Sequence, residues 1–207
     1  MRDITSELVE LVRITSTDLP NSIQEALDKA RAVETEGSAA QAAMVSILEN
    51  VEMSRRNQTP ICQDTGTPLF FVKYGQSWEP GALKTQIRAA IAEATKRSYL
   101  RPNAVDSLHG KNTGNNLGDD NFPTIHFQEI PGDELIVDLM LKGGGCENVG
   151  RQYSLPDVGL GADRDLEGVR KVVLDAVYQA QGQGCAPGFL GVAIGGDRGS
   201  GYLVSKE

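Results

Sequence analysis

The sequence predicts a mixed α/β fold (mixed α+β), with a helical N-terminal layer packed on a mixed β-sheet domain. Three observations predict it: apolar residues recur at helical spacing through residues 1–56, strand-type and helix-type runs alternate loosely afterwards, and no internal repeat appears. A chain of 207 residues is long enough for one sizeable core. We therefore expect one domain over residues 1–207, with residues 1–56 as the helical layer within it.

Three helices are predicted in that layer. An apolar stripe runs through residues 8–12, 23–30 and 39–53. The two interruptions between these segments hold Pro, Asn and Gly, and they end in Ser22 and Ser38. Because serine is a favoured N-cap residue, we predict that the second and third helices begin at these serines.

The remaining elements follow from changes in periodicity and from turn residues. Residues 69–74, 124–130, 135–141 and 189–194 are predicted strands, the last one buried, and the short turn at residues 131–133 predicts a hairpin between the second and third. Helices are predicted at residues 83–99, with Pro80 in the first turn, and at 166–181, with Val169, Val172, Val173, Ala176 and Val177 facing inward. Residues 101–123 predict a long ordered loop, which is more often functional than idle.

Charge and composition exclude several classes of protein. The net charge of −8 comes from 20 basic and 28 acidic residues, so no basic face for nucleic acid is expected. No apolar run approaches the length of a membrane span, and the N-terminus lacks the apolar core of a secretory signal. Three distant cysteines do not form a disulfide framework, which predicts a cytoplasmic protein. Residues 201–207 resemble the opening of a helix that is cut short, so we expect a longer polypeptide.

The three cysteines, Cys62, Cys146 and Cys185, lie in polar, glycine-containing segments that are typical of turns. Three converging thiolates would suit an iron–sulfur cluster with one iron left free, whereas a buried free cysteine beside an Asx turn is the alternative for Cys62. A zinc site would need paired CxxC motifs or clustered histidines, and neither occurs. The cysteines are 84 and 39 residues apart, so only the tertiary fold could assemble a cluster.

Two further segments could bind an anion. Three glycines at residues 143–145 follow a predicted strand, and such a turn leaves backbone amides open to a ligand. The Gly-Lys-Ser/Thr ending of a phosphate-binding loop is absent. Arg101 could hold a carboxylate through two parallel hydrogen bonds, although a surface arginine is the simpler interpretation. His109 and His126 are isolated, and most lone histidines are neither ligands nor bases.

Taken together, these segments resemble the class I, iron–sulfur fumarate hydratase and tartrate dehydratase family, specifically its α-subunit or N-terminal region. The resemblance spans about residue 8 to the end of the sequence. It is carried by Ile61-Cys62-Gln63-Asp64-Thr65-Gly66, Arg101-Pro102-Asn103-Ala104, Asn112-Thr113-Gly114-Asn115, Lys142-Gly143-Gly144-Gly145, and Cys185-Ala186-Pro187 with the following Gly195-Gly196. It implies that residues 1–207 are an α-type iron–sulfur hydro-lyase domain truncated at its C-terminus.

The resemblance also implies a cofactor, a [4Fe–4S] cluster that three cysteines hold and whose fourth iron binds substrate. Cys62 and Cys185 match two of those ligands, and the third lies in a later segment beyond residue 207. Cys146 matches a position where some relatives have serine, so it is not expected to be a ligand. A second proline that relatives often carry is missing after Cys185, where the sequence has Ala186-Pro187-Gly188.

Substrate and partners are implied in the same way. Residues that match substrate-contacting positions are Gln63, Asp64, Arg101, Gly145 and Asn148. No catalytic base is expected in this chain, because that residue belongs to a C-terminal domain or β-subunit. The implied reaction interconverts (S)-malate and fumarate, with tartrate or another hydroxy-dicarboxylate as the alternative substrate, in a homo- or hetero-oligomer. A third alternative is an inactive structural half that needs its partner.

Overall fold

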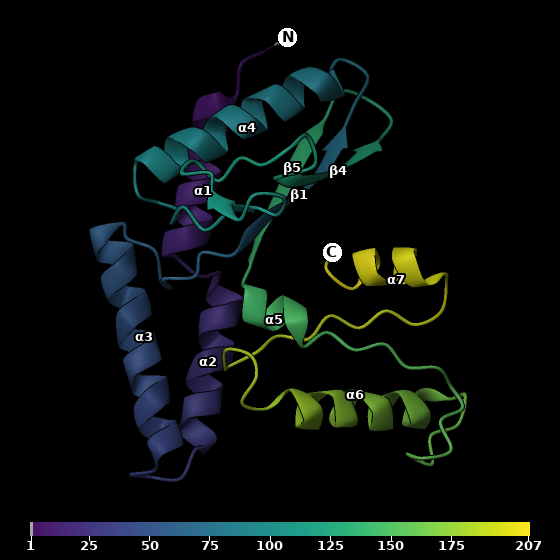
Figure 1. The fold of residues 1–207 in the computed structure, drawn as a ribbon. Coiled ribbons are helices and arrows are strands. Elements are labelled where there is room, and N and C mark those ends of the chain that lie inside the picture. Colours follow the sequence, from purple (N-terminus) through teal and green to yellow (C-terminus); the bar gives the residue numbers. More distant parts are fainter. Residues whose placement is uncertain (1) are drawn as a thin grey trace. The chain divides into compact units, whose positions relative to one another are not determined.

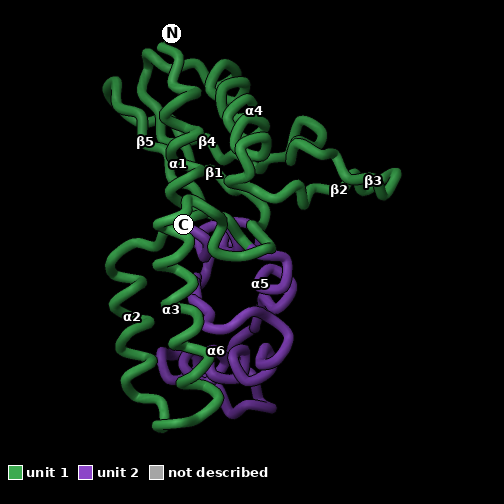
Figure 2. Tube along the Cα trace, turned by 90° about the vertical axis from the view of Figure 1, so that its left-hand side faces the viewer, with its two compact units in different colours: residues 1–142 green, residues 143–207 purple. Residues whose placement is uncertain are grey.

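The computed structural model describes residues 2–207, and the chain divides into two compact units (Figure 2). Unit 1 runs to Lys142, and unit 2 runs from Gly143 to Glu207. Helices and a mixed sheet make up unit 1, which confirms the mixed α/β class. No helix within residues 2–207 combines the length and the apolar character that crossing a bilayer requires.

Unit 1 contains the three predicted N-terminal helices, α1 (Thr5–Thr17), α2 (Asn21–Val33) and α3 (Ala39–Asn57). The N-cap prediction is confirmed at Ser38, whose Oγ accepts a hydrogen bond of 3.1 Å from the Gln41 amide. It is wrong at Ser22, because α2 already begins at Asn21. The carbonyl of Pro20 accepts the first amide hydrogen bonds there, so the helix starts without a side-chain cap.

The sheet of unit 1 has the strand order β4-β1-β5 (Figure 1). The strands are β1 (Thr67–Tyr74), β4 (Thr124–Glu129) and β5 (Leu135–Lys142). β1 runs parallel to β4 and antiparallel to β5. The predicted hairpin between β4 and β5 is therefore wrong, although both strands exist. β1 carries the most deeply buried run of the three strands, and placing it between the other two removes its apolar side chains from water.

One face of this sheet is covered by α1 and by α4 (Pro80–Lys96), which begins at the predicted proline. Phe70 and Val72 of β1 are almost fully buried and belong to the same core cluster as residues of the two helices. The core comprises Ile4, Leu8, Val9, Val12, Phe70, Val72, Leu83, Ile87, Ala90, Ile91, Ala94 and Leu100. α2 and α3 pack on each other and contribute no member to this core, so α1 is the part of the helical layer that packs on the sheet.

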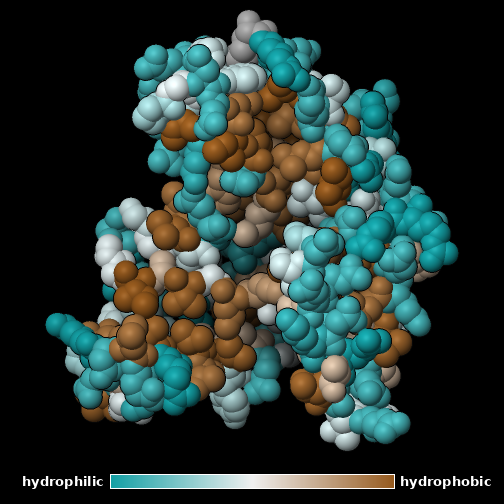
Figure 3. Space-filling model, turned by 180° about the vertical axis from the view of Figure 1, so that it is seen from behind, coloured by the Kyte–Doolittle hydropathy of each residue, from teal (hydrophilic) through white to brown (hydrophobic). Residues whose placement is uncertain are grey.

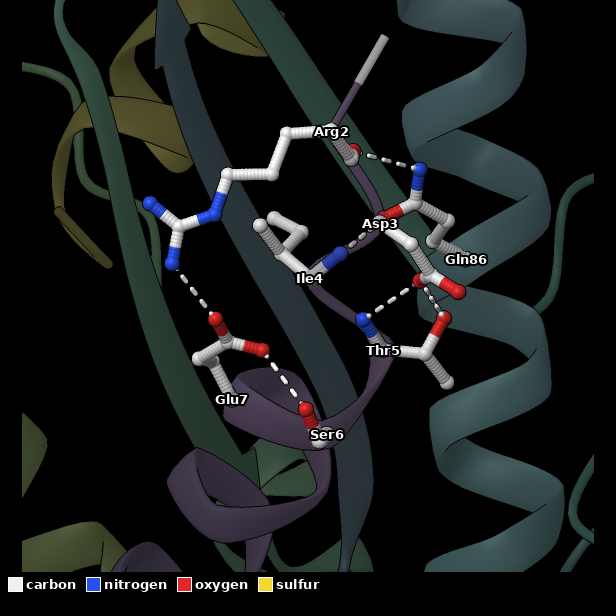
Figure 4. Close-up of polar contacts among 7 residues, drawn as sticks. All are labelled: Arg2, Asp3, Ile4, Thr5, Ser6, Glu7 and Gln86. Atoms are coloured by element: carbon white, nitrogen blue, oxygen red, sulfur yellow. Dashed lines mark hydrogen bonds and ion pairs between the residues drawn. The ribbon is translucent and has the colours of Figure 1, made fainter.

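Hydrogen bonds at the start of α1 attach it to α4 (Figure 4). The amide of Ile4 donates to Gln86 Oε1 at 2.8 Å, and Gln86 Nε2 donates to the carbonyl of Arg2 at 3.3 Å. Asp3 accepts from both the amide and the hydroxyl of Thr5, which lowers the pKa of its carboxyl group. These contacts fix the register of α1 on α4, and the end of α1 in turn supports the segment that contains Cys62.

The loop predicted at residues 101–123 is largely irregular, with two short paired strands, β2 (Val105–Asp106) and β3 (Lys111–Asn112). Backbone and side-chain hydrogen bonds order it throughout. Arg88 of α4, for example, donates to the carbonyls of Gly118, Asp119 and Phe122. The loop therefore has a defined conformation and is attached to α4.

Unit 2 contains α5 (Gly144–Asn148), α6 (Leu166–Ala180) and α7 (Arg198–Val204). The helix prediction for α6 is confirmed, but the inward position of Val177 is wrong, because that side chain is 45% exposed. The predicted buried strand at residues 189–194 is also wrong: the segment forms no strand, and four of its side chains are more than half exposed. Within the described part of unit 2 there is no β-strand with which it could pair.

Candidate functional site

The segment that carries Cys62 is anchored by α1 and α3. The amide of Ile61 donates to the carbonyl of Ser16 at 2.9 Å, and Asn50 Nδ2 donates to the carbonyl of Ile61 at 2.8 Å. The backbone on either side of Ile61 is thus held by two helices, and the next residue, Cys62, is an exposed free thiol. The alternative of a buried free cysteine is wrong for Cys62.

An ion pair joins the same two helices beside this anchor. Asp18, which caps the C-terminus of α1, accepts a hydrogen bond of 2.7 Å from Arg55 Nε in α3, and Arg55 Nη2 lies 2.7 Å from the same carboxylate oxygen. Arg55 also donates to Gln24 at 2.8 Å. The Arg55 guanidinium lowers the pKa of the Asp18 carboxyl group, with a contribution from the amide of Leu19. The end of α1, which supports Ile61, is therefore attached to α3 by an ion pair.

After Cys62 the chain turns sharply into β1. The amide of Gly66 donates to Asp64 Oδ1 at 2.9 Å, which forms an Asx turn. Gly66 has φ +77°, and a Cβ there would lie 2.5 Å from the carbonyl carbon of Lys142. Only glycine allows this close approach, so the Asp64 turn lies against the last residue of β5.

The buried side chain of Asn116 holds both ends of the Arg101 segment. Asn116 Nδ2 donates to the carbonyl of Arg101 at 2.7 Å, and Asn116 Oδ1 accepts from the amide of Ala104 at 3.0 Å. Nδ2 also donates to Thr95 Oγ1 at 3.0 Å, and Thr95 is fixed in α4 by its own bond to the Ile91 carbonyl. The backbone of residues 101–104 is thus attached to α4, while the Arg101 side chain is exposed.

The Cys62 and Arg101 segments meet directly in unit 1. The amide of Arg101 donates to Thr65 Oγ1 at 3.2 Å, and Asn103 Nδ2 donates to Asp64 Oδ1 at 3.3 Å. The structure therefore brings together two of the predicted segments, which contain Gln63, Asp64 and Arg101. Sequence reasoning missed the role of Asn116, because nothing in the run Asn112-Thr113-Gly114-Asn115-Asn116 distinguishes the buried amide from its exposed neighbours.

The other predicted site residues lie in unit 2, where α5 packs on the segment just before Cys185. A Cβ on Gly145 would lie 3.7 Å from the carbonyl oxygen of Gln183, and one on Gly184 would lie 3.5 Å from Val149. Gly145 and Cys185 are thus near each other within the unit. Asn148 at the end of α5 is exposed, as is the Cys185 thiol, whereas Cys146 is partly buried.

Glu147 attaches α5 to α7 and its C-terminal turn. Tyr202 Oη donates to Glu147 Oε1 at 3.2 Å, and Lys206 Nζ donates to the same oxygen at 2.8 Å. Burial and the Glu147 carboxylate both raise the pKa of Tyr202. The short helix that carries Gly145 and Asn148 is therefore held in place by side chains that follow it by more than fifty residues.

Comparison with known proteins assigns the family. The model for the fumarate hydratase (fumerase) family matches residues 5–207, nearly the whole chain. The chain belongs to this family. It is 49% identical over its whole length to a Geobacillus stearothermophilus protein named "Putative fumarate hydratase class I", and it spans 41% of that relative.

Two further relatives are less similar to the chain. The chain is 32% identical to "Putative L(+)-tartrate dehydratase subunit alpha" of Methanocaldococcus jannaschii, over 99% of the chain and 71% of the relative. It is 30% identical to "L(+)-tartrate dehydratase subunit alpha" of Escherichia coli, over 92% of the chain and 61% of the relative. The chain thus spans between two fifths and about seven tenths of the length of these relatives.

The cysteines can be compared with the cluster expected in the fumarate hydratase family. Cys62 in unit 1 and Cys185 in unit 2 are exposed free thiols with glycines close by in sequence, and thiolates are the ligands that iron–sulfur clusters take. Within residues 2–207 no group of three or more His, Cys, Asp or Glu side chains is placed to hold a metal ion. Each of these two thiols, taken by itself, has the chemistry and the exposure of a cluster ligand.

The remaining candidates lie apart from this chemistry. The His109 ring lies 3.2 Å from Asp106 in the exposed loop, and the His126 ring stacks on Phe71 at 5.3 Å between centroids. A cavity of about 430 Å³ opens between the start of α1 and the end of α4. It is lined by Asp3, Thr5, Ser6, Val9, Glu10, Glu93, Arg97 and Tyr99, none of which is a predicted site residue.

Proposed function

We propose that this chain is the cluster-bearing part of a [4Fe–4S] hydro-lyase that reversibly hydrates fumarate to (S)-malate. The observation that carries the choice of substrate is the identity of 49% to the Geobacillus class I protein along the whole chain. The two tartrate dehydratase α-subunits are 30–32% identical. The proposal also includes a cytoplasmic location, where a reducing environment keeps thiols free.

In this proposal Cys62 and Cys185 are two of the three cluster ligands, and Cys146 is not a ligand. Their exposure supports this division, because a thiol must reach the cluster, while Cys146 is partly buried. When bound, the cluster supplies a Lewis acid that makes hydroxide a better leaving group from the substrate. The third ligand belongs to sequence that this chain does not contain.

Arg101 binds one substrate carboxylate in the proposed site. A guanidinium group offers two parallel N–H donors to a carboxylate, a geometry that lysine cannot reproduce. The attachment of residues 101–104 to α4 supports this role, because a fixed backbone reduces the entropy lost when the exposed side chain closes on its ligand. Gln63, Asp64, Gly145 and Asn148 complete the proposed set of substrate contacts.

The base that removes the C3 proton is proposed to lie outside this chain. A C-terminal domain or a β-subunit would supply it, in a homo- or hetero-oligomer, together with further basic groups for the second carboxylate of a small dicarboxylate substrate. The lengths of the relatives support this division, since they extend well beyond the region that matches this chain. By itself the chain would then be a catalytically incomplete half.

The second candidate is the α-subunit of an L-tartrate dehydratase. The chain covers 71% of the length of the Methanocaldococcus α-subunit but only 41% of the length of the Geobacillus protein. This larger coverage favours the second candidate. Malate and tartrate differ by a hydroxyl group at C3. Polar contacts that recognise this group decide between them.

A chimera tests the proposal. The chain replaces the matching part of the Geobacillus relative, and fumarate hydration and tartrate dehydration are assayed without oxygen. Fumarate turnover by the chimera supports the first candidate and tartrate turnover the second. A folded, iron-loaded chimera that acts on neither substrate would contradict both.

The isolated chain provides a second test, by anaerobic reconstitution with iron and sulfide. We expect substoichiometric iron per chain, because two cysteines hold a cluster less well than three. Full, stable occupancy would show that the ligand set is already complete within residues 1–207.

A further inference from the structure

An apolar stretch in unit 2 combines the composition of a buried strand with an exposed position. Residues 189–194 read Phe-Leu-Gly-Val-Ala-Ile. Phe189, Leu190, Val192 and Ile194 are 62%, 63%, 53% and 66% exposed. Aromatic and β-branched residues of this kind are typical of sheet interiors, and soluble proteins rarely leave them together in water. The segment lies on the path from α6 to α7 (Figure 1).

The order of side chains indicates where such a strand would lie in a sheet. Successive side chains of a strand point to opposite faces, so Leu190, Val192 and Ile194 would share one face and Phe189 the other. Neither face would carry a charged or polar side chain. Strands that are apolar on both faces are typical of buried positions, covered on both sides and paired with a neighbour.

The rest of unit 2 does not provide that cover. The backbone of Ser205 lies against Gly191, so closely that a Cβ on Gly191 would collide with the carbonyl oxygen of Ser205. The side chains of Leu190 and Val192 on either side of this glycine nevertheless stay exposed. The apolar residues that are buried in the described part of unit 2 are Ala162 and Val172. Leu174, Val177 and Tyr178 of α6 are exposed too, and Figure 3 shows hydrophobic side chains gathered over this unit. Unit 2 thus lacks enough apolar surface of its own to cover residues 189–194.

We infer that residues 189–194 are a docking strand, and that its occupant is an apolar β-strand from the C-terminal sequence that longer members of the family carry beyond the matched region. The relatives provide the material for this partner, because the chain spans 41% of the Geobacillus protein and 61% of the Escherichia coli α-subunit. The inference rests on the proposed function in one respect, namely the need for a C-terminal domain or β-subunit. It adds the surface on which that partner binds.

Amide hydrogen exchange tests the docking strand. It is measured in the isolated chain and in the chimera with the Geobacillus relative, with the amides of β1 as an internal control for a folded unit 1. We expect the amides of residues 190–194 to exchange freely in the chain alone and to slow by at least ~100-fold in the chimera, since paired strands open far more rarely than loops. Free exchange of these amides in a chimera whose β1 is protected would overturn the inference.

A matched pair of variants sharpens the test. Val192→Lys places a charge in the docking strand, whereas Val158→Lys places the same charge at a position that is 93% exposed elsewhere in unit 2. In the chimera, Val192→Lys should abolish the protection and Val158→Lys should retain it. Equal behaviour of the two variants would contradict the assignment. Protection that already occurs in the isolated chain and grows with its concentration would instead identify a second copy of the chain as the occupant.

The assay for activity is kept separate from the exchange measurement. If the amides of residues 190–194 are protected in a chimera that hydrates no fumarate, the proposed function is contradicted and the docking strand is supported. If the chimera is active while these amides exchange freely, the docking strand is contradicted and the proposed function is supported.

Discussion

The side-chain amide of Asn116 fixes the backbone of Arg101 from inside unit 1. Its Nδ2 lies 2.7 Å from the Arg101 carbonyl, and its Oδ1 accepts from the Ala104 amide three residues later. One buried side chain, 4% exposed, therefore holds both ends of a four-residue segment. Arg101 itself remains exposed, so Asn116 positions the backbone while the Arg101 side chain stays accessible for the binding role proposed above.

Replacing Asn116 by Asp should destabilise unit 1 by about 2 kcal/mol, because the carboxylate cannot donate to the Arg101 carbonyl or to Thr95. Urea unfolding measures the change. Asn115→Asp is the matched control, since Asn115 Oδ1 only accepts a bond, from the Leu117 amide, and an aspartate can do the same. Equal stability of the two variants would show that the donor contacts of Asn116 contribute little.

Arg101→Lys should lower kcat/KM of the chimera by at least ~10-fold, because an ammonium group cannot bind a carboxylate with two parallel N–H bonds. Its unfolding midpoint should not change, since the side chain is exposed. Arg97→Lys is the control, because Arg97 is an exposed arginine that pairs with Glu93 of α4 and is not a proposed site residue. An unchanged kcat/KM in Arg101→Lys would remove this residue from the proposed site.

The three cysteines should differ in the chimera. Cys62→Ala and Cys185→Ala should each abolish cluster assembly, since both thiols are proposed ligands, whereas Cys146→Ser should retain most of the iron. Iron content and visible absorption after anaerobic purification measure the effect. Equal losses in all three variants would make Cys146 a ligand as well.

The link between α1 and α3 should depend on pH through Asp18. The pKa of Asp18 is lowered in the folded chain, so its ionised form stabilises the fold above the ordinary value of 3.8. This contribution is lost as the pH falls through the lowered pKa. Asp18→Asn should therefore reduce the unfolding midpoint at pH 7 and should match the unsubstituted chain well below pH 3.8. A difference between the two proteins that does not vary with pH would contradict the ion-pair origin.

Several local features could be predicted from the sequence because they depend on neighbouring residues. Helical periodicity predicted α1, α3 and α6, and the serine at position 38 was predicted as the N-cap of α3. These features arise from short-range hydrogen bonds and from one side of a helix meeting the core. The site residues stay a prediction, and the contact between the Cys62 and Arg101 segments depends on hydrogen bonds between residues 36 and 39 positions apart.

Pairing between distant segments was decided only by the tertiary structure. β4 and β5 look like a hairpin in the sequence, yet β1 lies between them because its apolar residues gain most from the central position. Asn116 gained its role through burial, which no pattern in its own segment indicates. Residues 189–194 show the limit most clearly, since the sequence determined that they are apolar, while the lack of a pairing strand in unit 2 left them exposed. A strand needs a neighbour, and the sequence of the strand alone cannot provide it.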